Sequence, residues 1–159
     1  MSNNMKKILI AALMLATMAA CGDDDDKKDL IYPEIAVNQL DAIPNDCHEY
    51  RRGEVINVNY VFTDDTELGK FNIEIHNNFD HHSHSTSATE CTMDPAKSPV
   101  NPWVFNHDYD IPSGQREYRA AVEIAIPSHI DTGDYHFMVR LTDKAGWQQI
   151  KAVSIKVVE

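Results

Sequence analysis

Long stretches of this chain alternate between apolar and polar residues with a period of two. The segment Val55–Thr63 places Ile56, Val58, Tyr60 and Phe62 on one face. Successive side chains of an extended strand point to opposite faces, so this pattern is typical of strands that are buried on one side. No stretch shows the 3.6-residue period of an amphipathic helix of useful length. The alternation therefore predicts an all-β fold.

The predicted strands are short and are separated by turns or by proline. They are Ile31–Val37, Val55–Thr63, Leu68–His76, Glu117–Ile126, Tyr135–Thr142 and Gln149–Val158, with short irregular strands around Trp103–Phe105. Pro33 marks the first as an edge strand, because proline has no backbone N–H to donate to a neighbouring strand. Residues Asn77–Gly114 have no sustained period, so we expect a long, His-rich insertion there. About seven short strands of this kind predict a β-sandwich.

The first twenty residues have the composition of an export signal. Two lysines precede the apolar run Ile8–Met18, which is too short to span a bilayer, and small residues precede Cys21. We therefore expect Met1–Ala20 to be a signal peptide. The ending Leu15–Cys21 resembles the lipobox of bacterial lipoproteins, which implies that Cys21 is acylated and becomes the mature N-terminus. The alternative is an ordinary secretory signal followed by an unrelated cysteine.

An acidic run, Asp23–Asp26, follows the cysteine directly. It resembles the surface-export signal of Bacteroidetes lipoproteins, which implies a lipid-anchored protein of the outer membrane that faces the cell exterior. Two other interpretations are a solvated tether and an Asp-Asp-Asp-Asp-Lys cleavage tag. The intact signal directly before the run argues against the tag.

The chain carries a formal charge of −11, and loss of the signal peptide with its two lysines would make it −13. A strongly acidic domain repels phosphate backbones, so we expect no nucleic-acid partner. The same charge attracts cations. No second apolar segment is long enough to cross a membrane.

Two cysteines remain after Cys21. Cys47 and Cys91 are most simply a disulfide in an exported protein. Such a bond would stabilise the fold by roughly 4 kcal/mol on the chain-entropy model. The alternative is a thiolate metal site that includes His48 and Met93, soft ligands that favour copper(I).

The segment Ile126–Tyr135 resembles the turn before the penultimate strand of immunoglobulin-like domains, which implies that the Tyr135 hydroxyl bonds back to upstream backbone. The mature chain also resembles a family of Bacteroidetes surface lipoproteins classed as a domain of unknown function. The lipobox, the phrase Phe71–His84 and this turn carry that resemblance. It implies an immunoglobulin-like fold and a surface location. We expect a signal peptide at residues 1–20, a lipidated cysteine with an acidic tether at 21–30, and one immunoglobulin-like domain at 31–159.

Four of the eight histidines fall within nine positions of the predicted insertion. Imidazole is the commonest neutral ligand for zinc and copper in proteins. His82 and His84 point the same way in extended backbone, and His76 ends a strand. His107 could return from the far limb of the insertion, whereas His81 should point away. We therefore predict a zinc or copper site made by His76, His82, His84 and His107, with His81 as the weakest candidate. An unliganded surface loop is the alternative.

Two functions follow from these features. The first is a cell-surface lipoprotein that binds zinc or copper through its histidines. The second is a non-enzymatic interaction module that presents the insertion to a surface protein or glycan. The sequence has no nucleophile elbow, phosphate loop or metalloprotease motif, so we expect no enzyme. Asp64, Asp65 and Glu67 could bind calcium, although a simple turn explains them equally well.

Overall fold

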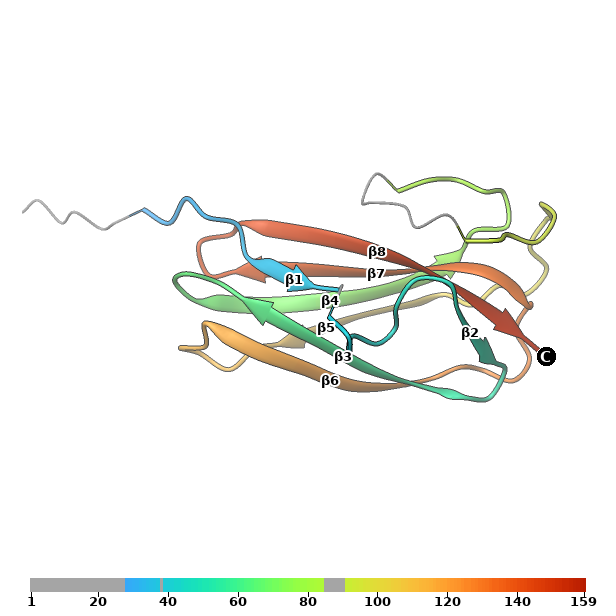
Figure 1. Ribbon diagram of the computed structural model, residues 1–159, viewed down its shortest axis with the longest axis horizontal. Helices are drawn as coiled ribbons and strands as arrows, with labels where there is room; N and C mark the ends of the chain where they lie inside the picture. The colour runs from blue at the N-terminus through green and yellow to red at the C-terminus, as the bar shows by residue number, and fades with distance from the viewer. Residues whose placement is uncertain (1–27, 38, 85–90) are drawn as a thin grey trace, which may run out of the picture.

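The computed structural model describes residues 28–37, 39–84 and 91–159 (Figure 1). The described residues form eight strands in two sheets and contain no helix, so none of them builds a helix that could cross a membrane. The strands are β1 (Glu34–Ala36), β2 (His48–Arg51), β3 (Val55–Thr63), β4 (Leu68–Asn77), β5 (Phe105–Asp110), β6 (Glu117–Ala125), β7 (Gly133–Asp143) and β8 (Gln148–Val158). The predicted signal peptide Met1–Ala20, Cys21 and the acidic run Asp23–Asp26 lie outside the described residues.

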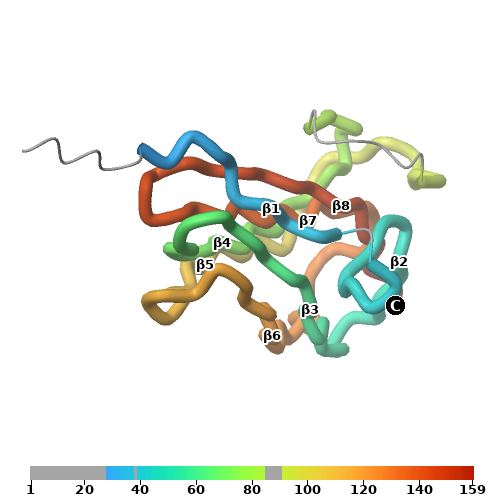
Figure 2. The backbone as a smooth tube through the Cα atoms, turned by 60° about the vertical axis from the view of Figure 1, so that its left-hand side comes forward, coloured from blue at the N-terminus to red at the C-terminus, as the bar shows by residue number. Residues whose placement is uncertain are grey.

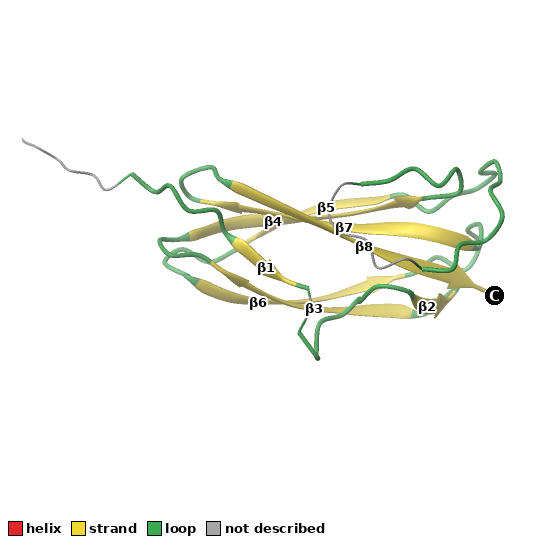
Figure 3. Cartoon of the chain, turned by 45° about the horizontal axis from the view of Figure 1, so that its top comes forward, coloured by secondary structure: helices red, strands yellow, loops and turns green. Residues whose placement is uncertain are grey.

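The two sheets pack face to face as the layers of a β-sandwich (Figure 3). One sheet has the order β1-β3-β6, and the other has the order β2-β8-β7-β4-β5. All neighbours are antiparallel except β2, which runs parallel to β8. Immunoglobulin-like domains divide their strands between two sheets in the same way, with β3 and β6 in one sheet and β4, β7 and β8 in the other. The predicted all-β sandwich is therefore confirmed.

The core lies between the sheets and consists of the side chains that the alternation placed inward. Ile56 and Phe62 of β3 are fully buried, and so are Ile73 and Ile75 of β4. Burial of each such side chain stabilises the fold by about 1.5–3 kcal/mol. The polar residues between them consequently face outward, which leaves the outer side of each sheet free to carry a site.

Tyr135 makes the predicted bond at the start of β7. Its hydroxyl donates to the carbonyl oxygen of Asp131 at 2.7 Å and accepts from the backbone N–H of Trp103 at 3.2 Å. The side chain is almost fully buried. This tyrosine corner fixes the backbone at the first residues of β7, including the next residue, His136.

The structure corrects three details of the predicted strands. β1 spans only Glu34–Ala36, although it is an edge strand as expected. β2 was not predicted, because Tyr50 is its only buried side chain and so it shows no alternation. The insertion contains a regular strand, β5, where only short irregular strands around Trp103–Phe105 were expected. β5 pairs with β4 over six residues, and its mostly exposed, polar side chains hide it in the sequence.

The two ends of the sandwich differ in what surrounds them. At one end the chain leaves β4 and forms an excursion over Asn77–His84, which we call the His limb. Figures 1 and 2 both place this limb at the end opposite the N-terminal segment. The turn between β3 and β4 and the hairpin between β7 and β8 lie with the N-terminal segment at the other end (Figure 1).

Candidate metal centre

The first histidine of the site stands at the end of β4, on the outer face of the five-stranded sheet. The alternation that buries Ile73 and Ile75 points His76 outward. Its side chain is only 20 % exposed, because the His limb folds back over it. A regular strand therefore fixes the position of this imidazole.

The His limb turns sharply after β4 and carries two more histidines to the first. The backbone N–H of Asn78 donates to the carbonyl oxygen of Asp134 at 2.8 Å, and that of His81 donates back to Asn78 at 3.2 Å. His81 adopts a φ of 59° at this turn. The chain thus reverses direction, and His82 and His84 come to lie against the outer face of the sheet.

The three imidazoles meet at their Nε2 atoms. His76 Nε2 lies 3.2 Å from His82 Nε2 and 3.0 Å from His84 Nε2. One ring nitrogen of each residue lies within 4.8 Å of the others. Around a tetrahedral zinc ion with Zn–N bonds of 2.0–2.1 Å, ligand nitrogens are separated by about 3.3 Å. The spacing of these nitrogens is therefore close to that of a metal's coordination shell.

Carboxylates lie at the far nitrogens of two of these rings. Asp80 Oδ1 is 2.5 Å from Nδ1 of His82. Glu74 Oε1 is 3.1 Å from Nδ1 of His76, although the angle is not that of a hydrogen bond. Histidines that bind metals almost always direct their other ring N–H to a carboxylate, a carbonyl or water, which fixes the tautomer and makes the ligand more basic. The hydrogen bond to Asp80 orients Nε2 of His82 toward the common point, and the Glu74 carboxylate lies beside Nδ1 of His76.

A fourth histidine, His136, packs against the other three. It lies on β7 directly across from His76 in the β4–β7 register. Its ring centroid is 4.6 Å from that of His84 and 5.0 Å from that of His82. Because a carbonyl oxygen only accepts, His136 Nε2–H donates to the carbonyl oxygen of His82 at 3.1 Å. His136 is only 6 % exposed, so it supports the His limb from beneath.

The surroundings of the cluster favour neutral imidazoles. Burial lowers the pKa of His76, and the neighbouring His84 and His82 lower it further, whereas Glu74 raises it. Burial lowers the pKa of His136 to about 4. Metal ions bind the neutral form of imidazole, so these effects keep His76 ready to bind at neutral pH.

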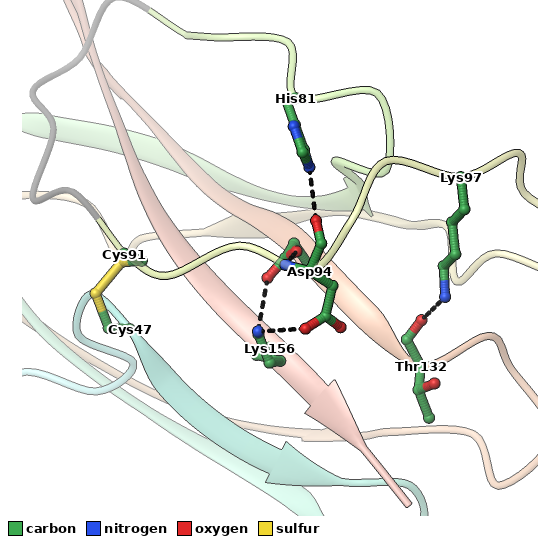
Figure 4. Close-up of polar contacts among 8 residues, drawn as sticks. Cys47, His81, Cys91, Asp94, Lys97, Thr132 and Lys156 are labelled. Carbon is green, nitrogen blue, oxygen red and sulfur yellow. Dashed lines mark hydrogen bonds and ion pairs between the residues drawn. A yellow bond between two sulfur atoms is a disulfide. The ribbon is translucent and has the colours of Figure 1, made fainter.

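The chain after residues 85–90 is fastened to the sandwich at several points (Figure 4). A disulfide joins Cys91 to Cys47, which confirms the predicted pairing and leaves neither sulfur as a thiolate ligand. Lys156 Nζ lies 2.8 Å from Asp94 Oδ1, and Asp94 also donates its backbone N–H to Asp134 Oδ2 at 2.8 Å. These contacts hold residues 91–94, the second limb of the insertion, beside the His limb.

His81 and His107 lie apart from the three convergent nitrogens. His81 Nε2 contacts the carbonyl oxygen of Asp94 at 2.9 Å (Figure 4), so this ring links the two limbs of the insertion. His107 lies across from Ile73 on β5 and contacts the ring of Tyr109. Because residues directly opposite in a β-ladder share a face, His107 is on the face opposite that of His76. The prediction that His107 joins the site is therefore wrong.

His136 was absent from the residues predicted from the sequence. The signal that could have found it is strand pairing, since β4 and β7 are neighbours in immunoglobulin-like sheets. His76 is the last outward residue of β4, and His136 is the first outward residue after Tyr135 on β7. Matching the two strand ends would have placed both rings on one face.

Neither of the two tryptophans presents a fully exposed ring. Trp103 is only 4 % exposed and belongs to the core. Trp147 is half-buried and contacts Tyr32, with ring centroids 4.8 Å apart. On the outer face of the five-stranded sheet, the histidine cluster is therefore the candidate site, because its ring nitrogens converge.

The chain matches the family described as a domain of unknown function (DUF4625) over residues 19–158. The match covers most of the chain, so the chain belongs to that family. No curated protein matches it. The family description states no activity, and any function must therefore be inferred from the geometry of the site.

Proposed function

We propose that this member of the DUF4625 family binds one zinc or copper(II) ion through Nε2 of His76, His82 and His84. The observation that carries the proposal is the approach of two ring nitrogens to within 3.2 Å and 3.0 Å of His76 Nε2. The lone pairs of three Nε2 atoms directed at one another repel unless a proton or a metal ion lies between them. At neutral pH a metal ion satisfies all three lone pairs at once.

The donor set supports a borderline cation. All three ligands are nitrogen, which suits zinc and copper(II) and does not suit calcium or magnesium. Soft copper(I) prefers sulfur ligands, and the two cysteines among the described residues, Cys47 and Cys91, are both in the disulfide. Three protein nitrogens also leave a fourth position for water or for a ligand from another molecule.

Preorganisation supports the proposal further. His76 is fixed by β4, and His82 is fixed by Asp80 at its Nδ1 and by His136 at its carbonyl oxygen. The disulfide closes a separation of 44 residues that contains the whole His limb. Because these groups are ordered before binding, less conformational entropy is lost when a metal ion binds.

The role that we propose is capture or delivery of the ion at a bacterial surface. The basis is the lipobox-like ending Leu15–Cys21 and the acidic run Asp23–Asp26, which together indicate a lipid anchor in the outer membrane with the domain outside the cell. We propose binding without catalysis, because the sequence has no nucleophile motif or metalloprotease motif.

The test is zinc and copper(II) titration calorimetry on the protein as its host cell produces it, after chelation. One equivalent of metal should bind. The double variant His82→Ala, His84→Ala should lose more than about 100-fold in affinity, because even an outer-shell partner contributes about 10–100-fold. The matched control is His107→Ala, His129→Ala, which removes two exposed histidines outside the convergent cluster and should bind as the wild type does.

Absence of uptake by the wild-type protein at micromolar metal would overturn the proposal. Equal losses in the double variant and in the control would overturn it too, because the binding would then be nonspecific. In either case the second function takes its place, with the insertion as the surface that contacts a protein or glycan.

A further inference from the structure

A second cluster of potential ligands lies at the opposite end of the sandwich from the histidines. Asp29 belongs to the N-terminal segment, Asp64 to the turn after β3, and Asp143 to the end of β7. One carboxylate oxygen of each lies within 4.8 Å of the others. Figure 1 shows these three parts of the chain at the same end. Residues that are far apart in sequence therefore share one small volume.

In each carboxylate, one oxygen is held by backbone N–H groups of its own turn. Oδ1 of Asp29 accepts from Ile31 at 3.0 Å, Oδ1 of Asp64 from Thr66 at 2.9 Å and Glu67 at 2.7 Å, and Oδ1 of Asp143 from Gly146 at 2.6 Å and Trp147 at 2.8 Å. These bonds fix the plane of each carboxylate. The second oxygen of each group is thereby directed away from its own turn.

The second oxygens are buried and unpaired. Oδ2 of Asp29, Asp64 and Asp143 is inaccessible to solvent and has no hydrogen-bond partner. Asp143 is only 4 % exposed as a residue. Within residues 28–37, 39–84 and 91–159, no lysine or arginine forms an ion pair with any of the three.

Such an arrangement is unfavourable without a cation. Buried charges in proteins are normally paired or bound to metal ions. Burial raises the pKa of Asp143, and the charges of Asp64 and Asp29 raise it further, which is the direction expected for a carboxylate that lacks a counter-charge. Backbone turns hold the three groups in place, so they cannot simply turn outward to water.

We propose that Asp29, Asp64 and Asp143 bind a calcium ion through their Oδ2 atoms. The ligands are all oxygen, and hard cations such as calcium prefer carboxylates and carbonyls. Calcium accepts irregular geometry with six to eight oxygens, so water and backbone carbonyls can complete the shell. The site is independent of the histidine cluster, which offers only nitrogen.

This calcium ion would clamp the N-terminal segment to the body of the domain. Asp29 is the only one of the three ligands outside the sandwich, and its carbonyl oxygen also accepts from Trp147 Nε1 at 2.9 Å. Tyr32 lies against the same indole. The neighbouring Leu30 and Ile31 remain exposed, so the clamp rests on Asp29 and these two ring contacts. Calcium would thus fix how the domain leaves the preceding chain.

Terbium luminescence and thermal unfolding test the calcium site on the full-length protein. The indole of Trp147 lies at the cluster, so terbium bound there should show emission sensitised by tryptophan, and calcium should displace it. Calcium at about 100 times its Kd should raise the melting temperature by roughly 8 °C. Hydrogen exchange of the peptide that contains Asp29 and Ile31 should slow when calcium is added.

The variants Asp64→Asn and Asp143→Asn keep the Oδ1 acceptor that each turn needs but remove the charge. Both should abolish the terbium emission and the calcium-dependent rise in melting temperature. The matched control, Asp65→Asn, changes an exposed carboxylate of the same turn and should behave as the wild type does. If Asp143→Asn fails to fold, Asp64→Asn and Asp29→Asn carry the test.

The double variant His82→Ala, His84→Ala should retain the calcium response in full, which separates this site from the proposed transition-metal site. A wild-type protein whose melting temperature does not respond to millimolar calcium would overturn the proposal. So would terbium emission of wild-type strength in Asp64→Asn, since the ion would then bind elsewhere, for example at Asp23–Asp26.

Discussion

The two ends of this sandwich hold two convergent clusters that differ in chemistry and in origin. At one end, His76, His82 and His84 bring three ring nitrogens together, and all three come from one stretch of nine residues. At the other end, Asp29 and Asp143 come from segments more than one hundred residues apart, and the cluster offers only oxygen. One fold thus presents a nitrogen site and an oxygen site on opposite ends.

The difference shows how each end is held in position. His76 lies on β4, whereas His82 and His84 lie on the His limb, which is held by β4, by His136 and by the Cys47–Cys91 disulfide. The aspartates sit on tight turns whose backbone N–H groups hold one oxygen of each carboxylate. If both proposals hold, borderline cations bind the histidines and hard cations bind the aspartates, so the two ends should respond differently to each perturbation below.

The largest difference should appear with pH. Zinc affinity should begin to fall near the ordinary pKa of histidine, about 6.5, and should be more than about 100-fold lower at pH 5, since protons then compete with zinc for the ring nitrogens. Because the pKa of His76 is lowered, this one ring stays neutral to lower pH and contributes less to the loss than an ordinary histidine would. Carboxylates ionise near pH 4, so calcium affinity should fall by less than about tenfold over the same interval.

Calorimetry of both metals at pH 7.5 and pH 5 measures this difference. Because the pKa of Asp143 is raised, this carboxylate begins to be protonated at a higher pH than usual, so calcium affinity should fall slightly as the pH is lowered. A zinc affinity that does not change between the two pH values would contradict ligation by imidazole.

A smaller effect is expected from the carboxylates behind the histidines. Asp80→Asn and Glu74→Gln should each weaken zinc binding by about tenfold or more, because each removes the negative charge beside Nδ1 of a ligating ring. Asp108→Asn is the matched control. Its carboxylate is exposed on β5 near Lys70 and Asn72 and should not affect zinc. Calcium binding should be unchanged in all three variants.

The smallest effect on metal binding is expected at His136. His136→Phe keeps a ring under the His limb but loses the hydrogen bond to the carbonyl oxygen of His82. The free energy of unfolding should fall by about 1 kcal/mol, as for a typical hydrogen bond. Zinc affinity should fall by less than about tenfold. Urea unfolding and calorimetry measure the two quantities, and complete loss of zinc binding would show that His136 is itself a ligand.

The sequence predicted most of the sandwich because its longer strands alternate over most of their length. β3 and β6 alternate throughout, β4 from Phe71, β7 from Phe137 and β8 from Val153. Tyr135 makes the bond that the resemblance of its turn implies. β2 and β5 were not predicted as regular strands because most of their side chains are exposed, so neither segment alternates between apolar and polar residues. An edge strand with polar side chains carries no period for the sequence to reveal.

The sites follow the same rule of local information. His76, His82 and His84 could be predicted because they are neighbours in the chain. His107 was wrongly included because its face of the sheet depends on how β5 pairs with β4. His136 was missed because it approaches through the pairing of β7 with β4. Asp64 was considered as a calcium ligand only with its neighbours Asp65 and Glu67, since Asp29 and Asp143, which lie beside it in the fold, are far away in the sequence.

The most direct test of the central claim is the anomalous signal of zinc in crystals of the zinc-loaded protein. The account predicts one strong peak about 2.0–2.1 Å from Nε2 of His76, His82 and His84. A crystal in which zinc binds only one of these rings, or lies elsewhere on the domain, would contradict it.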